Sequence, residues 1–137
     1  MKKIKLTIEI GNREHKNPAG VVKLNGHTIH DGEYTETEYE FEPVIGTNTL
    51  EISLTNKKPR DTKLSGNAIV EDIFVIVKDI VCQVTKDSAG DLDVIGEYTT
   101  DVGENLKTYG YLSYNGVYKF TFDYPFFVFK KNKLFYQ

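Results

Sequence analysis

The side chains able to do nucleophilic chemistry are few and scattered. The chain has three histidines and one cysteine, Cys82. Nucleophilic catalysis needs a hydroxyl or thiol beside a base that a third group orients. His15 falls in a predicted loop, while His27 and His30 leave a predicted two-residue turn on opposite faces, which also separates them as metal ligands. The 20 acidic residues show no spacing that singles out a catalytic carboxylate pair. The sequence therefore indicates a binding or structural protein and not an enzyme.

Oxygen-bearing side chains gather in two polar stretches, and Ca²⁺ takes its carboxylate and amide ligands from irregular loops of this kind. The candidate ligands are Asn56, Asp61, Asn67 and Asp72 in the first stretch, and Asp87, Asp91 and Asp93 in the second. The second stretch lacks the glycine position and the distal glutamate of an EF-hand loop. Two interpretations stay open for both stretches, a cation site and a set of solvated turn residues.

Aromatic side chains are concentrated in the last third of the chain. Of 9 tyrosines and 8 phenylalanines, 12 lie between Tyr109 and Tyr136. The dipeptide Asn115-Gly116 predicts a type I′ turn. Pairing outward from that turn puts Ser113 opposite Tyr118, Tyr111 opposite Phe120 and Tyr109 opposite Phe122. Such an aromatic ladder fills a core or forms a sugar platform, and the absence of tryptophan favours the core.

The run Phe126-Phe127-Val128-Phe129 is hard to bury within one domain, because alternate residues of a strand face opposite sides. An exposed apolar patch of that kind marks a protein interface. We therefore expect a partner protein to cover Phe126, Phe127, Phe129 and Tyr136.

The elements that must position these residues are predicted to be strands. Apolar and polar residues alternate along residues 4–10, 35–41 and 50–54. Residues 69–81 are apolar on both parities, which predicts a central strand. Residues 85–107 lose the pattern and are expected to form a long loop. Turns separate the strands and no helix is predicted, so we expect a single domain over residues 1–137 with an all-β, antiparallel β-sandwich fold of jelly-roll type.

A second type I′ turn is predicted at Asn25-Gly26, which lies between two alternating runs. Pairing outward from this turn puts Leu24 opposite His27 and Val22 opposite Ile29. The resulting hairpin has one apolar face for the core.

Charge and hydropathy exclude several classes of partner. The net charge is −3, from 17 basic and 20 acidic residues, so no basic field is available to neutralise nucleic-acid phosphates. No apolar run is long enough to span a bilayer, and the alternating first ten residues do not resemble a secretion signal. We expect a protein made in the cytoplasm that binds neither nucleic acid nor membrane.

The span 21–81, with its hairpin, "TNTLEISLTN" and "AIVEDIFVIVKDI", resembles calcium-dependent xylan-binding carbohydrate-binding modules, which are small β-sandwiches. In those modules a loop-bound calcium ion contacts sugar hydroxyls. The resemblance therefore implies Ca²⁺ as a cofactor, a glycan as partner, and Asp61 and Asp72 as the nearest candidates for its ligands.

About three-quarters of the chain resembles more closely a group of small β-sandwich proteins of tailed bacteriophages. The resemblance rests on Asn56-Lys57, Asp61-Thr62, residues 69–72, and the ending "GYLSYNGVYKFTF" followed by Pro125-Phe126. It implies a virion component, such as a head decoration, neck or tail protein, made in the host cytoplasm. Our leading hypothesis is a non-catalytic module that docks on other virion proteins in several copies through its aromatic end. The alternative is a free calcium-dependent carbohydrate-binding module.

Overall fold

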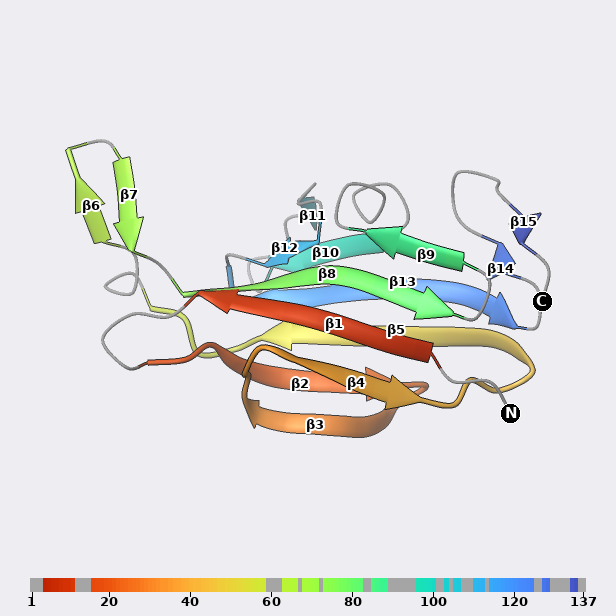
Figure 1. Cartoon of the computed structure of the whole chain (residues 1–137). Coiled ribbons are helices and arrows are strands. Elements are labelled where there is room, and N and C mark those ends of the chain that lie inside the picture. The colour runs from red at the N-terminus through yellow and green to blue at the C-terminus, as the bar shows by residue number, and fades with distance from the viewer. Residues whose placement is uncertain are drawn as a thin grey trace.

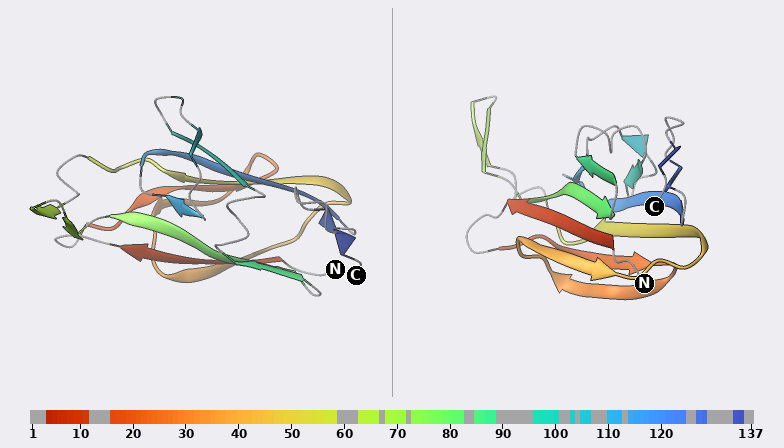
Figure 2. Two further views of the ribbon diagram at one scale, coloured as in Figure 1. Left: turned by 90° about the horizontal axis from the view of Figure 1, so that it is seen from above. Right: turned by 45° about the vertical axis from the view of Figure 1, so that its right-hand side comes forward.

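Two antiparallel sheets lie face to face and form a β-sandwich (Figures 1 and 2). The computed structural model describes residues 4–11, 16–58, 63–66, 68–71, 73–82, 85–88, 96–100, 103, 105–106, 110–112, 114–124, 127–128 and 134–135. All of the regular structure in these residues is strand. The all-β sandwich predicted from the alternation pattern is confirmed.

The small sheet has five strands and the large sheet has six. In order across the small sheet are β12 (Tyr111–Leu112), β8 (Phe74–Cys82), β1 (Ile4–Gly11) and β4 (Thr37–Phe41), with β9 (Thr85–Ser88) also paired to β8. In order across the large sheet are β11 (Asn105–Leu106), β10 (Gly96–Thr100), β13 (Gly116–Tyr124), β5 (Gly46–Leu54), β2 (Ala19–Leu24) and β3 (His27–Glu33). Two further strand pairs are β6 (Lys63–Ser65) with β7 (Ala68–Glu71), and β14 (Phe127–Val128) with β15 (Leu134–Phe135). The first of these pairs projects beyond one end of the sandwich (Figure 1).

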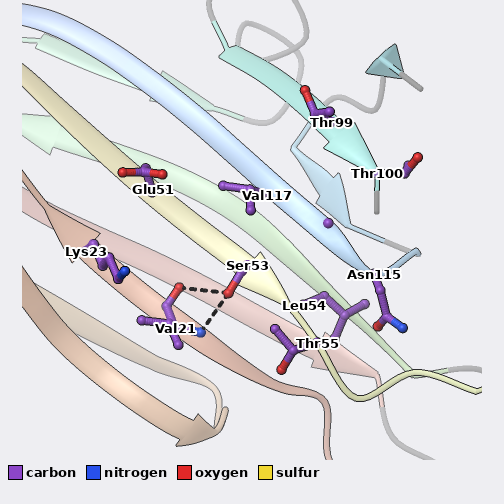
Figure 3. Close-up of a pocket in the computed structure, with 11 residues that line it drawn as sticks. Val21, Lys23, Glu51, Ser53, Leu54, Thr55, Thr99, Thr100, Asn115 and Val117 are labelled. Carbon is purple, nitrogen blue, oxygen red and sulfur yellow. Dashed lines mark hydrogen bonds between the residues drawn. The ribbon is translucent and has the colours of Figure 1, made fainter. Parts of the chain in front are cut away.

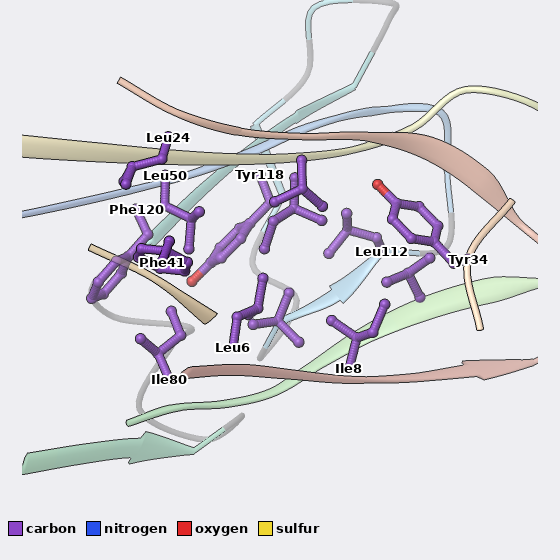
Figure 4. Packing of buried hydrophobic residues seen from close by; sticks show 14 of the residues in the cluster. Leu6, Ile8, Leu24, Tyr34, Phe41, Leu50, Ile80, Leu112, Tyr118 and Phe120 are labelled. Carbon is purple, nitrogen blue, oxygen red and sulfur yellow. The ribbon is translucent and has the colours of Figure 1, made fainter. Parts of the chain in front are cut away.

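The core lies between the sheets, and every second residue of the main strands points into it (Figure 4). The fully buried apolar side chains of β1, β5 and β13 are Ile4, Leu6, Ile8, Leu50, Ile52, Leu54, Tyr118, Phe120 and Phe122. The period-two alternation of these segments is therefore the direct cause of their burial. The prediction that the Tyr109–Phe122 aromatic ladder fills the core is confirmed for Tyr118, Phe120 and Phe122, whereas Tyr111 is only half-buried and Tyr109 lies outside the described residues.

The first predicted hairpin forms, but its register changes. Asn25 and Gly26 have φ of 51° and 81°, as a type I′ turn requires, and Leu24 pairs with His27. A bulge then shifts the ladder between Val22 and Lys23, so that Val22 pairs with His30 and not with Ile29. The predicted separation of His27 and His30 onto opposite faces is therefore wrong, because both now pair with inward-facing residues of β2.

The second predicted hairpin does not form. Neither Asn115 nor Gly116 has a positive φ. Strand β12 pairs with β8 of the small sheet, whereas β13 pairs with β5 and β10 of the large sheet. The chain therefore crosses between the two sheets at this dipeptide, and Tyr111 pairs with Ile76 and not with Phe120.

Two strand boundaries were also misjudged. The apolar segment 69–81 divides into β7, which pairs with β6 across a turn at Gly66 (φ 63°), and β8, which lies inside the small sheet. The segment 85–107 contains β10, whose Tyr98 is buried in the core. The alternation in β10 is too weak to predict a strand, because Tyr98 is its single inward-facing aromatic residue and its neighbours are polar residues and glycine.

Candidate functional site

A trough of about 530 Å³ lies on the outer face of the large sheet (Figure 3). This volume falls within the range of small-molecule binding sites. Strands β2, β5, β10 and β13 supply most of the lining. The lining residues are Val21, Lys23, Glu51, Ser53, Leu54, Thr55, Thr99, Thr100, Asn115, Gly116 and Val117.

This face of the large sheet is concave because short and long side chains lie in neighbouring rows. In one row across the strands, Ser53 pairs with Val117, and Val117 pairs with Thr99. In the next row of outward residues, Lys23 pairs with Glu51. The two rows lie about 7 Å apart, because same-face residues of a strand are two positions apart. Short side chains therefore form the floor, and the longer Lys23 and Glu51 form one rim.

Ser53 also holds the floor in shape. Its Oγ accepts a hydrogen bond from the Val21 N–H at 2.9 Å and donates one to the Val21 carbonyl at 3.3 Å. On the inner side, the buried Tyr34 hydroxyl donates a hydrogen bond of 2.6 Å to the Ser53 carbonyl. A Cβ on Gly20 would lie 1.9 Å from that carbonyl oxygen, so only glycine allows β2 to approach β5 here.

Asn115 forms the wall at the end opposite Lys23 (Figure 3). Its side-chain amide accepts a hydrogen bond from the Lys57 N–H at 2.9 Å and donates one to the Lys57 carbonyl at 2.8 Å. The Lys57 ammonium in turn lies 5.8 Å from the centre of the Tyr114 ring, which is 60% exposed. A Cβ on Gly116 would lie 2.4 Å from the Thr99 carbonyl oxygen, so glycine is required for close contact between β13 and β10. The Asn-Gly pair thus makes contacts with the segment after β5 and with the neighbouring strand β10, and does not form a type I′ turn.

Comparisons with known proteins yield a likeness of fold. No protein-family model matches the chain, and no curated protein matches it. Among solved structures, the chain is similar to one described as "vCBM60 in complex with galactobiose", with a TM-score of 0.54 and 15% sequence identity. The match covers 86% of this chain and 96% of the chain in that solved structure. The shared feature is the antiparallel β-sandwich.

Asn56, a predicted calcium ligand, has a structural role in the described part of the chain. Its Oδ1 accepts a hydrogen bond from the Ala19 N–H at 2.8 Å, and its Nδ2 donates one to the Asn17 carbonyl at 3.0 Å. These bonds tie the segment after β5 to the start of β2. The other candidate ligands of the first stretch, Asp61, Asn67 and Asp72, lie outside the described residues, as do Asp91 and Asp93.

Most of the predicted interface residues lie in parts of the chain that the structure does not describe. Phe126, Phe129 and Tyr136 lie outside the described residues, and only the backbone of Phe127 is described, within β14. Strand β14 follows Tyr124, which pairs with Gly46. Val44 and Ile45, just before Gly46, are 52% and 80% exposed, so this end of the sandwich presents apolar side chains.

The histidines form no constellation with a nucleophile in the described part. His27 is exposed beside the turn. The His30 ring stacks on Tyr34 at 5.0 Å between ring centres and lies tilted against Tyr39 at 5.4 Å. No group of three or more His, Cys, Asp or Glu side chains that could hold a metal occurs among the described residues. None of the described residues belongs to a helix long and apolar enough to cross a membrane.

Proposed function

We propose that this protein is a non-catalytic module that binds a carbohydrate chain. The observation that carries the proposal is the hydroxyl- and amide-lined trough on the face of a β-sandwich similar in fold to a module solved with galactobiose. A fold hosts many functions, so the residues that line the trough must themselves suit a sugar.

The trough offers the two kinds of contact that a sugar needs. A sugar ring presents hydroxyl groups at its edge and C–H groups on its faces, so its site must combine hydrogen-bonding side chains with apolar ones. Glu51 supplies carboxylate oxygens, Lys23 supplies an ammonium, and Thr99 supplies a hydroxyl, while the Ser53 hydroxyl, whose proton is bonded to the Val21 carbonyl, offers a remaining lone pair as an acceptor. Val21 and Val117 supply aliphatic surface, and Val117 is 38% exposed. The trough therefore matches an amphipathic, hydroxyl-rich ligand.

Glycan binding is tested on the purified chain by isothermal titration calorimetry with galactobiose and with xylo-oligosaccharides, followed by a glycan array. We expect saturable binding to at least one glycan. We also expect the recovered ligand to be intact by chromatography, since the module is proposed to be non-catalytic. Absence of binding across the array contradicts the proposal, and a shortened ligand contradicts its non-catalytic part.

A role as a virion component is a second proposal, which the sequence resemblance supports. The motif that carries the resemblance includes Tyr118, Phe120 and Phe122, which are core residues and so report on the fold. The specific observation in favour of docking is the exposed pair Val44 and Ile45 at the same end as β14. Mass spectrometry of purified phage particles tests this role: the protein is expected in the particle, and its absence contradicts the proposal.

A further inference from the structure

We propose that the trough recognises an uncharged oligosaccharide directly through Lys23 and Glu51, without a bridging calcium ion. This inference rests on the proposed carbohydrate-binding function and adds to it the site, the ligand class and the mode of contact. It differs from the calcium-bridged recognition that the sequence resemblance implies.

The charged side chains at the rim are available to a ligand. Lys23 and Glu51 are directly paired in the β2–β5 ladder, and Glu51 also pairs with Lys119 of β13. Even so, within the part of the chain that the structure describes, none of these three side chains makes an ion pair or a hydrogen bond. An ammonium and a carboxylate side by side can donate to one hydroxyl of a sugar and accept from its neighbour.

The outer face of the small sheet shows that this chain does form cross-strand ion pairs. There Lys5 and Glu40, paired in the β1–β4 ladder, approach to 3.7 Å, and Lys78 lies 2.9 Å from Glu9. These side chains are between 42% and 56% exposed, so they too face water. Among the described residues, charged neighbours thus form ion pairs on the small sheet but not at the trough, which leaves Lys23 and Glu51 able to bind the hydroxyl groups of a ligand.

The remaining lining sets the charge and shape of the ligand. Lys23 and Glu51 are the charged side chains of the lining and their charges cancel, so the site has no field that favours an acidic or a basic sugar. Val21 and Val117 lie on either side of Ser53 in one cross-strand row. Three strand spacings separate β2 from β10, about 14 Å, so the floor is longer than one sugar ring. An uncharged oligosaccharide lying across the strands fills this space.

The test is a titration of four proteins, each with and without EDTA, using whichever of galactobiose or a xylo-oligosaccharide the wild-type chain binds. The variants are Glu51→Gln, Lys23→Met and the matched control Lys119→Met. Lys23→Met removes the charged donor, and Glu51→Gln removes the charge of the acceptor, so we expect about a tenfold loss of affinity for each. Lys119 lies in the same row and also pairs with Glu51 but does not line the trough, so its variant is expected to stay within about twofold. EDTA is expected to change none of the four affinities.

A second measurement locates the ligand independently of the variants. Amide shifts of the ¹⁵N-labelled chain are expected to change at Lys23, Glu51, Ser53 and Val117 on addition of the same oligosaccharide. If the oligosaccharide binds but EDTA abolishes binding, or if the shifts fall only in residues 56–72, the direct-contact inference is overturned while the proposed function stands. If no glycan binds the wild-type chain, both fail. Circular dichroism and urea midpoints verify that the three variants are folded.

Discussion

Replacing Tyr34 with phenylalanine should produce a loss of stability that disappears in alkaline solution. Tyr34 is fully buried, and its hydroxyl donates a 2.6 Å hydrogen bond to the Ser53 carbonyl beneath the trough. Burial, assisted by the nearby Tyr39, raises the pKa of this hydroxyl well above its ordinary value. The hydroxyl therefore stabilises the fold at neutral pH through its hydrogen bond. In alkaline solution it destabilises the fold, because the folded chain retains a proton that the unfolded chain releases.

At neutral pH the Tyr34→Phe variant loses one buried hydrogen bond, which costs about 1 kcal/mol of unfolding free energy. Above about pH 10 the unfolded wild-type chain releases the Tyr34 proton while the folded chain retains it. A group whose pKa is raised in the folded state contributes its full stabilisation below the unfolded-state pKa. This contribution to the unfolding free energy falls as pH rises above that pKa, here by about 1.4 kcal/mol per pH unit for one proton. The variant has no such proton, so the two proteins should have equal stability near pH 11.

The assay is urea unfolding of wild type and variant at several pH values from 7 to 11, followed by circular dichroism. Tyr114→Phe is the matched control, because the same hydroxyl is removed from a ring that is 60% exposed. We expect the gap between wild type and Tyr34→Phe to close above pH 10, and no comparable change for the control. A gap that stays constant to pH 11 refutes the reasoning, since it would mean that the buried hydroxyl ionises as readily as in the unfolded chain.

Three further substitutions test the packing, each by its urea unfolding midpoint. Gly116→Ala places a Cβ 2.4 Å from the Thr99 carbonyl oxygen and should cost about 1–3 kcal/mol by overpacking; an unchanged midpoint contradicts the close contact. Asn48→Ala removes a fully buried amide that bonds to the Val44 N–H and to two carbonyls, and should cost about 3 kcal/mol because these backbone groups lose their partner. Leu50→Ala should cost about 2–5 kcal/mol from the cavity in the core; a cost below 1 kcal/mol for either contradicts its burial.

The strands whose alternation is strict were predictable because their signal is local. In β1 and in residues 50–54 of β5, every second residue is aliphatic, and the structure buries all of these residues except the half-buried Ile10. Period two alone distinguishes the inward from the outward face, whatever the partner strand. The core positions of β13 followed in the same way, even though its predicted partner was wrong.

Strand partners were not predictable from the same evidence. Asn25-Gly26 and Asn115-Gly116 are the same dipeptide, yet only the first adopts positive φ and joins two strands of one sheet. At the second, the preceding strand β12 finds its partner in β8 of the opposite sheet. A turn dipeptide favours a local backbone conformation, but pairing of the preceding strand with a distant strand can override that preference.

The candidate site was missed for a related reason. The trough depends on the registers of four strands, and its neighbours Lys23, Glu51 and Val117 are far apart in the sequence. Taken singly, they are the outward residues of ordinary amphipathic strands. The sequence pattern instead favoured the polar stretch after β5, where Asn56 bonds to the backbone of residues 17 and 19.

Strand β13 shows why a motif can identify a fold without identifying a ligand. Its inward residues, Tyr118, Phe120 and Phe122, fill the core and carry the resemblance to other small β-sandwiches. Its outward residues, Val117 and Lys119, alternate with them and face the trough or lie beside it. Substitution of outward residues changes the binding face while the core is preserved, because the two sets point to opposite sides of one sheet. The ligand must therefore be inferred from the outward positions.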